Sequence, residues 1–289
     1  MPFAKIGPVN LHYEIVGASG PVLALTPGGR RSFNEFLSLA DKIARQGFRV
    51  LLHDRRNCGL SDIYFDRSDA EDSLWAEDLQ ALLTFIDAGD VFVGGSSSGC
   101  RTSILHFLRH PQRVRGLCLF RVTGGPFAAR RLPENYYHRF IAAAREGGME
   151  GVCAIDHWQE RFKLRPRDRD LLLSMDVDRY IDVMSFWRDR FLQGVDLPIL
   201  GVTAAELQSI TVPTVIIPGN DMIHSSASGA IARSLIPDAL LHPLPIEDTK
   251  RDLIPFGEWA PQEEEIASAF VDLMHHAQDG RSNRREARA

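Results

Sequence analysis

The chain lacks the cysteine pattern of a disulfide-stapled or zinc-binding protein. Its 289 residues include four cysteines and no C-x-x-C pair. Four scattered cysteines are too few to staple a chain of this length. We therefore expect them to be reduced and buried among apolar side chains. They are Cys58, Cys100, Cys118 and Cys153.

Long hydrophobic runs and an excess of positive charge are also missing. No apolar stretch is long enough to cross a bilayer, and no early segment has the pattern of a cleaved secretion signal. Lysine and arginine number 33 against 38 acidic residues, so the formal charge of -5 gives no electrostatic case for nucleic acid or membrane binding. We expect a cytoplasmic protein that acts on a small molecule, and the sequence leaves a homodimer open.

Motifs that indicate common cofactors are absent as well. The chain has no H-E-x-x-H, no G-x-x-x-x-G-K and no G-x-G-x-x-G in its first strand-helix unit. We predict neither a cofactor nor a metal. The composition, 44% hydrophobic and 25% charged, is that of an ordinary globular protein with a large core.

Strand-like and helix-like patterns alternate along most of the chain, which is typical of a mostly parallel sheet covered by helices. Strand patterns cover residues 9–16, 22–25, 49–53, 91–95, 117–120, 212–217 and 239–244. Helix patterns cover residues 73–85, 100–110, 226–235 and 263–274, and Ser32 is a plausible N-cap of an earlier helix. We predict a doubly wound α/β core from residues 1–124 and 207–277. The polar, arginine-rich residues 278–289 are predicted to be a disordered tail.

The strand pattern stops between residues 125 and 206, where helix-like patterns take over. An all-helical insertion between two strands predicts a cap over the carboxyl edge of the sheet, where open α/β sheets bind ligands. A helical flank without a pocket is the alternative. Trp158 and Trp187 are our candidates for substrate contacts in this cap. Because aromatic residues at helical spacing often pack inward, a place in the core of the cap is the alternative for both.

The most informative segment is G-S-S-S-G at residues 95–99, which links an apolar strand to a helix pattern. Glycines on both sides of Ser97 permit a tight strand-to-helix turn that holds the hydroxyl at the helix N-terminus. Developing negative charge is favoured there. The pattern predicts a serine nucleophile at Ser97, and a flexible serine-rich loop is the alternative.

Four segments carry a resemblance to α/β-hydrolase-fold proteins of the capped, serine-elbow kind. They are T-P-G-G at residues 26–29, D-R-R-N-C-G-L-S-D at 54–62, the elbow at 95–99 and P-G-N-D at 218–221. His110 and Pro111 follow Ser97 by thirteen and fourteen residues, where such proteins often end the elbow helix. That spacing selects Ser97 over its two serine neighbours. The resemblance covers nearly the whole chain and implies an α/β-hydrolase fold.

The resemblance also implies partners for Ser97. The backbone N–H groups of Ser98 and Gly29 would form the oxyanion hole, and Asp221 would be the acid that orients a catalytic histidine. A plain glycine-rich turn is the alternative for Gly29, and a turn aspartate before a helix is the alternative for Asp221. The segment that begins at Asp54 mostly shapes a loop in such proteins, so Asp54 is expected to be structural.

The expected catalytic histidine is missing from its usual place. The resemblance puts it between the last strand and the final helix, but residues 245–259 contain no histidine. His224 follows Asp221 by three residues and lies at the carboxyl edge of the sheet, so we predict it as the base. A solvent-facing or helix-start role is the alternative, and His157 and Lys250 are further candidates. His242 is expected to be a core or flank residue of the last strand.

These features predict hydrolysis of an ester, lactone or activated C–C bond of a small hydrophobic carbonyl compound. Two other hypotheses keep the fold and the pocket. One is a binding or receptor-like protein that has lost turnover, and the other is a non-hydrolytic enzyme such as a cofactor-free oxygenase, lyase or cyclase. The distance from Ser97 Oγ to the nearest imidazole nitrogen separates them, because about 3 Å is needed for a serine-histidine pair.

Overall fold

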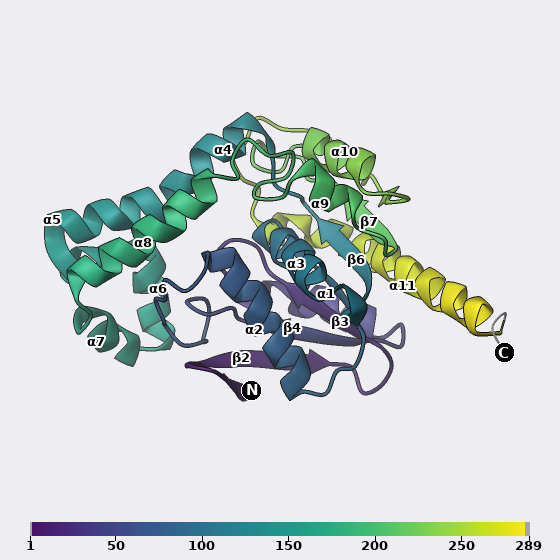
Figure 1. The fold of residues 1–289 in the computed structure, drawn as a ribbon, viewed down its shortest axis with the longest axis horizontal. Helices are drawn as coiled ribbons and strands as arrows, with labels where there is room; N and C mark the ends of the chain where they lie inside the picture. Colours follow the sequence, from purple (N-terminus) through teal and green to yellow (C-terminus); the bar gives the residue numbers. More distant parts are fainter. Residues whose placement is uncertain (1, 287–289) are drawn as a thin grey trace.

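A single twisted sheet forms the centre of the molecule (Figure 1). The computed structural model describes residues 2–286, and side chains are described for residues 2–279. Within these residues the sheet has eight strands in the order β1-β2-β4-β3-β5-β6-β7-β8. They are β1 (Phe3–Ile6), β2 (Val9–Val16), β3 (Val22–Thr26), β4 (Arg49–His53), β5 (Val91–Ser96), β6 (Val114–Phe120), β7 (Thr214–Ile217) and β8 (Leu240–Leu241). β2 pairs antiparallel with β1 and β4, and the other pairs are parallel. The predicted mostly parallel sheet is confirmed.

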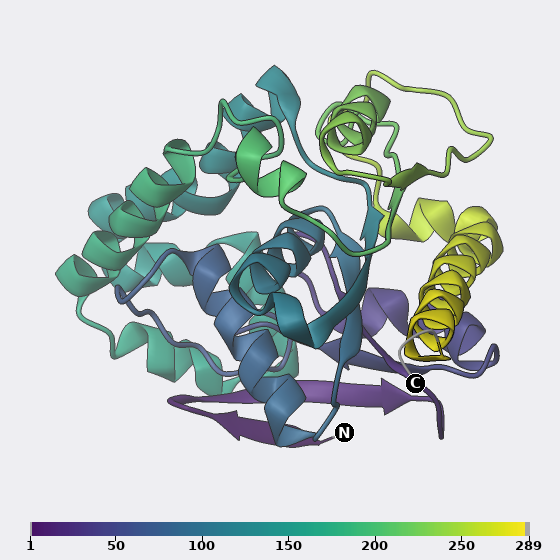
Figure 2. The same cartoon turned by 45° about the vertical axis from the view of Figure 1, so that its right-hand side comes forward.

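Helices cover both faces of the sheet, which explains why every residue of β3, β5 and β7 is buried. Figure 2 shows the sheet between the two groups of helices. One face packs against α2 (Glu71–Phe85), α3 (Ser98–Arg109), α9 (Ala204–Gln208) and α10 (Ser226–Leu235). The other packs against α1 (Leu37–Ala44) and α11 (Glu263–Glu286). The short helices η1 (Phe33–Phe36), η2 (Pro111–Arg113) and η4 (Phe256–Gln262) join these elements.

A helical insertion lies between β6 and β7 and forms a separate apolar cluster. Its members are α4 (Gly125–Pro133), η3 (Glu134–His138), α5 (Arg139–Cys153), α6 (Asp156–Leu164), α7 (Arg167–Leu173) and α8 (Val177–Leu192). We call this group the cap. The predicted cap boundary at residue 206 falls inside α9, whose Leu207 packs with the core on the α10 side of the sheet. Among residues 2–286, no helix has both the length and the apolar character that crossing a membrane requires.

Several element ends differ from the prediction. The elbow helix begins at Ser98 rather than near Cys100, and β8 is only two residues long. The closing helix continues to Glu286, so residues 278–286 are helical where the sequence predicted a disordered tail. No proline follows Pro261, and the glutamine, arginines and glutamate of this segment favour helix, which offsets the weaker helix formers Gly280, Ser282 and Asn283. Residues 287–289 of the expected tail lie outside the described residues.

Candidate active site

Ser97 occupies a sharp turn between β5 and α3. Its backbone is in the left-handed region, with φ 57° and ψ -120°, which is uncommon for a residue with a side chain. A Cβ atom at Gly95 or Gly99 would collide with the backbone oxygen of Thr26 on the neighbouring strand. The two glycines therefore let the chain pass close to β3 while Ser97 is held at the start of α3.

The nearest base to this serine is His224. Its Nε2 lies 2.7 Å from Ser97 Oγ, and both side chains are buried. His224 belongs to the loop between β7 and α10, so it reaches Ser97 from the carboxyl edge of the sheet, as the sequence predicted. The Ser97 hydroxyl can donate its proton directly to this imidazole.

Asp221 holds the other side of the imidazole. Its Oδ1 lies 2.9 Å from His224 Nδ1 and also accepts the backbone N–H of His224 at 2.8 Å. The hydrogen bond to the Asp221 carboxylate assigns a proton to Nδ1 of the imidazole. Nε2 is then free to accept the hydrogen bond of the Ser97 hydroxyl. Asp221, His224 and Ser97 are therefore arranged as an acid, a base and a nucleophile, with acid and base only three residues apart.

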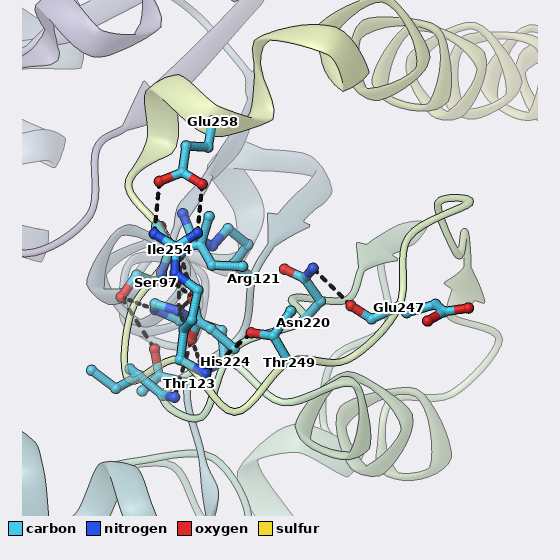
Figure 3. Close-up of polar contacts among 12 residues, drawn as sticks. Ser97, Arg121, Thr123, Asn220, His224, Glu247, Thr249, Ile254 and Glu258 are labelled. Carbon is cyan, nitrogen blue, oxygen red and sulfur yellow. Dashed lines mark hydrogen bonds and ion pairs between the residues drawn. The ribbon is translucent and has the colours of Figure 1, made fainter.

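A buried arginine and one backbone unit complete the arrangement (Figure 3). Arg121 Nη2 donates to Asp221 Oδ2 at 2.7 Å and to the Ile254 carbonyl at 2.6 Å. The Ile254 N–H donates to the same Asp221 oxygen at 3.0 Å. Ile254 belongs to residues 245–259, where the resemblance placed the histidine, so this loop fixes the acid instead of supplying the base. Sequence reasoning missed Arg121, although its position directly after β6 marks the functional edge of the sheet.

The charges of the site suit a base at neutral pH. Burial lowers the pKa of His224 below its ordinary value, and the positive charge of Arg121 acts in the same direction, although Asp221 opposes both. Burial raises the pKa of Asp221, but the hydrogen bond and charge of His224, the Ile254 N–H and Arg121 together bring it below the ordinary value. We therefore expect a neutral imidazole beside an ionised carboxylate.

Comparison with known families agrees with the fold of the core described above. A family profile described as alpha/beta hydrolase fold matches residues 21–122, which carry β3 to β6 and Ser97. The chain has an α/β-hydrolase fold. Its Ser97, His224 and Asp221 differ from the arrangement that the resemblance implied, because His224 precedes the last strand instead of following it.

Solved structures and curated sequences extend this comparison. The fold is similar to that of an enol-lactonase from Burkholderia xenovorans, with a TM-score of 0.64 and 18% identity over 95% of this chain and 100% of that one. It is also similar to that of a hydrolase from Pseudomonas aeruginosa, with a TM-score of 0.65 and 22% identity over 94% of this chain and 97% of that one. The sequence is 27% identical to a proline iminopeptidase from Lactiplantibacillus plantarum over 154 residues, 52% of each chain. It is 32% identical over 125 residues to 2-hydroxy-6-oxononadienedioate/2-hydroxy-6-oxononatrienedioate hydrolase from Paraburkholderia xenovorans, 42% of this chain and 43% of that one. The chain spans about half the length, or less, of these two curated relatives.

Both predicted oxyanion donors lie near Ser97. Ser98 is the first residue of α3, so its N–H has no acceptor within the helix. Gly29 has φ 49° and lines a cavity together with Ser97. Buried Arg55 binds the Gly29 carbonyl and also donates to Ser98 Oγ at 3.1 Å. One side chain thus ties the two turns together, an arrangement that sequence reasoning did not find.

Asp54 has the structural role that the sequence predicted. One carboxylate oxygen accepts the Phe33 N–H at 2.8 Å, and the other accepts the Leu60 N–H at 2.8 Å. His12 Nδ1 lies 2.8 Å from the second oxygen. These contacts shape the loop after β4. None of the three partner residues belongs to the Ser97 site.

Among the described residues, the other candidate bases form no hydrogen bond with Ser97, although His157 lines a cavity that Ser97 also borders. His157 lies in α6, and burial lowers its pKa to about 3. Lys250 is exposed. His242 follows β8 directly and forms a half-exposed ion pair with Glu265 at 2.9 Å, so it lies on the flank of the last strand and not in the core. Of these histidines and lysines, His224 is the one that meets the serine.

Two cavities meet at Ser97. The smaller is lined mostly by apolar side chains, including Trp75, Leu132, Phe191, Ile199 and Leu200. The larger, about 650 Å³, has a mixed lining of polar or charged residues, His224 among them, and apolar side chains such as Phe140, Leu253 and Phe256. Tyr136 and Leu132 border both. Ser97 and His224 therefore face a larger cavity with a mixed polar and apolar lining, and the smaller, mostly apolar cavity adjoins it at Ser97.

Trp158 and Trp187, our predicted substrate contacts, line neither cavity. Both are about 1% exposed and belong to the apolar cluster of the cap. Phe65 packs against both rings, and Trp187 Nε1 donates to the Asp69 carbonyl at 3.1 Å. The prediction that they contact substrate is corrected accordingly, because these large rings fill the interior of the cap. Tyr136, Tyr137 and Phe191 are the cap aromatics that face the apolar pocket.

Proposed function

We propose that this protein hydrolyses an ester, lactone or activated C–C bond of a small hydrophobic carbonyl compound through Ser97. The observation that supports this most directly is the 2.7 Å contact between Ser97 Oγ and His224 Nε2. A binding protein that had lost turnover would have no need to keep this contact together with an oriented acid. The names of an enol-lactonase and a dienedioate hydrolase among the similar proteins favour the same carbonyl chemistry.

The first half of the reaction forms an acyl-enzyme. Ser97 Oγ attacks the carbonyl carbon while its proton moves to His224 Nε2, and the carbonyl oxygen becomes an oxyanion. The N–H groups of Gly29 and Ser98 would donate hydrogen bonds to this oxyanion, and the positive N-terminal end of α3 would stabilise its charge further. When the oxyanion collapses, His224 passes the proton to the leaving group. Asp221 keeps the imidazole oriented and stabilises its charged form throughout.

The second half regenerates the serine. A water molecule gives a proton to His224 Nε2 and its oxygen attacks the acyl carbon. The bond to Ser97 Oγ then breaks, and the proton returns from His224 to the serine. Water can approach from the larger cavity, because His224 lines that cavity and the smaller one is mostly apolar.

Labelling with a fluorophosphonate probe tests this proposal. We expect the native protein to be labelled and Ser97→Ala to remain unlabelled, since the probe phosphonylates a serine that has a working base. Ser96→Ala is the matched control, because Ser96 is the neighbouring serine of the same turn and has no part in the mechanism. Labelling that persists in Ser97→Ala, or is absent from the native protein, would contradict the proposal.

Other expectations from the sequence stay predictions. The expected lack of nucleic-acid and membrane partners rests on the formal charge of -5, and a cytoplasmic location and a homodimer stay predictions as well. Size-exclusion chromatography with light scattering would measure the oligomeric state directly.

A further inference from the structure

Arg55, in the loop after β4, is a buried cation without a carboxylate partner. Its side chain is fully buried, and among residues 2–279 it forms no ion pair. The buried arginines Arg30, Arg56 and Arg121, in contrast, each bind a carboxylate at 2.9 Å or less. An unpaired buried charge is costly, because it loses its water and gains no opposite charge. Such a charge is expected where the negative charge that balances it forms only during a reaction.

The groups around Arg55 belong mostly to the two turns that carry the predicted oxyanion donors. Its Nη2 donates to the Gly28 carbonyl at 3.4 Å and to the Gly29 carbonyl, and its Nη1 donates to Ser98 Oγ at 3.1 Å. Ser98 Oγ in turn donates to the Gly29 carbonyl at 3.3 Å. The guanidinium carbon also lies 4.1 Å from the centre of the Trp75 ring. Each of these contacts is with a neutral group, so the positive charge of Arg55 is not cancelled.

The contact with Gly28 fixes the direction of one oxyanion donor. The Gly28 carbonyl and the Gly29 N–H belong to the same trans peptide unit, so the two groups point in opposite directions. Because Arg55 binds the carbonyl, the Gly29 N–H points away from the guanidinium. Gly29 lines the larger cavity together with Ser97. The charge of Arg55 therefore lies one peptide unit behind the N–H that would meet the oxyanion.

We propose that Arg55 is a positioning residue of the oxyanion hole, and that its buried charge favours the oxyanion over the neutral carbonyl. This inference rests on the proposed function, which supplies the oxyanion. A positive charge in a buried site attracts negative charge more strongly than it would in water. The substrate carbonyl is neutral before Ser97 attacks and negatively charged afterwards, so Arg55 stabilises the transition state more than the bound substrate. Arg55 therefore raises kcat and has little effect on KM.

Two uncharged variants test the proposal. Arg55→Met removes both the charge and the hydrogen bonds, and Arg55→Gln removes the charge but keeps an amide donor. We would measure kcat and KM for p-nitrophenyl butyrate, and the inhibition constant of butaneboronic acid, whose adduct with a serine is tetrahedral and negatively charged. In both variants kcat should fall by about tenfold to a hundredfold, less than removal of an oxyanion donor itself typically costs, while KM changes little. Binding of the boronic acid should weaken by a similar factor, because its adduct resembles the transition state.

The ion pair of the neighbouring arginine provides the matched control. Arg56 is also buried and binds Asp78 through two hydrogen bonds of 2.6 Å. The double variant Arg56→Met, Asp78→Leu removes this whole ion pair and leaves no unpaired charge. It should keep the kcat of the native protein and its affinity for the boronic acid. Thermal unfolding would show that each variant is folded, and Arg55→Gln alone decides the test if Arg55→Met does not fold.

The outcomes separate this inference from the proposed function. If the native protein hydrolyses the ester and the Arg55 variants keep its kcat and its affinity for the boronic acid, the inference is overturned and the proposed function stands. A lower kcat with unchanged affinity for the boronic acid, or a higher KM with unchanged kcat, would overturn the inference as well. If the native protein neither hydrolyses the ester nor binds the boronic acid, the proposed function fails and the inference fails with it.

Discussion

Arg121 contacts both the acid and the base of the site, which makes it the most instructive single residue. Its guanidinium is 2.7 Å from Asp221 and 3.2 Å from His224 Nδ1. A buried cation next to an imidazole disfavours the imidazolium form. At the same time it fixes the carboxylate that orients the ring. Arg121 therefore acts as a positioning residue that touches no substrate in the proposed mechanism.

The pH profile of the native protein should reflect this environment. Activity requires neutral His224, so kcat/KM should fall as the pH drops through the pKa of the free enzyme. Because burial and Arg121 lower that pKa, the acid limb is expected below the ordinary histidine value of 6.5. Measurement of kcat/KM between pH 4 and pH 9, about the range in which histidine titrates in proteins, would check this. An acid limb above 6.5 would contradict it.

Replacing Arg121 should move the acid limb of the pH profile of kcat/KM. In Arg121→Met the lowering effect of the positive charge is lost, so the pKa of His224 should rise and the acid limb should shift to higher pH. We also expect kcat/KM at the optimum to fall by about tenfold or more, because Asp221 loses a donor that orients it. Arg115→Met, at the other end of β6 with only a long contact to Asp90 at 3.9 Å, is the matched control. A lower rate with an unmoved acid limb would indicate a purely structural role.

The elbow between β5 and α3 shows how one element positions the chemistry. Close approach to β3 requires glycine on each side of Ser97, so Gly99→Ala should destabilise the fold by about 1–3 kcal/mol, as overpacking commonly does. Urea unfolding would measure this difference. Gly257→Ala is the control, because an added methyl there meets nothing within 4 Å. Equal stability of the two variants would mean that β3 and α3 can separate without cost.

Sequence patterns located these elements well but not every contact between them. Strand and helix periodicity and the G-S-S-S-G turn predicted the sheet, the cap and Ser97, and the lack of other suitable histidines led to His224. Arg121 and Ile254 could not be assigned, because their contact with Asp221 joins three separate loops after folding. The prediction that Trp158 and Trp187 contact substrate was wrong for a similar reason. Helical spacing shows that a side chain is buried but not whether it faces a cavity or another helix.

At the scale of the whole molecule, two arginines of the cap bind one loop of the core. Arg161 of α6 binds the backbone oxygens of Gly59 and Ser61 and pairs with Asp168 at 2.7 Å. Arg165 pairs with Asp62 at 3.0 Å. Residues 59–62 belong to the loop after β4 that Asp54 shapes. The roof of the larger cavity is therefore fastened to the same core loop that Asp54 holds in place.

Removing one of these attachments should loosen the cap without harming the triad. In Arg161→Met, Asp168 loses its short ion pair but keeps Arg165 at 3.5 Å, so the cost should stay below the roughly 3–5 kcal/mol that is typical when a buried charge is left unpaired. We expect faster hydrogen exchange in α6 and α7, and a higher KM with kcat changed less, since Ser97 and His224 stay on the core. Arg188→Met is the control, because Arg188 pairs only with its half-exposed neighbour Asp189 on α8. If exchange rose equally across the sheet, global destabilisation rather than release of the cap would explain the result, and the proposed role of Arg161 as a cap attachment would fail.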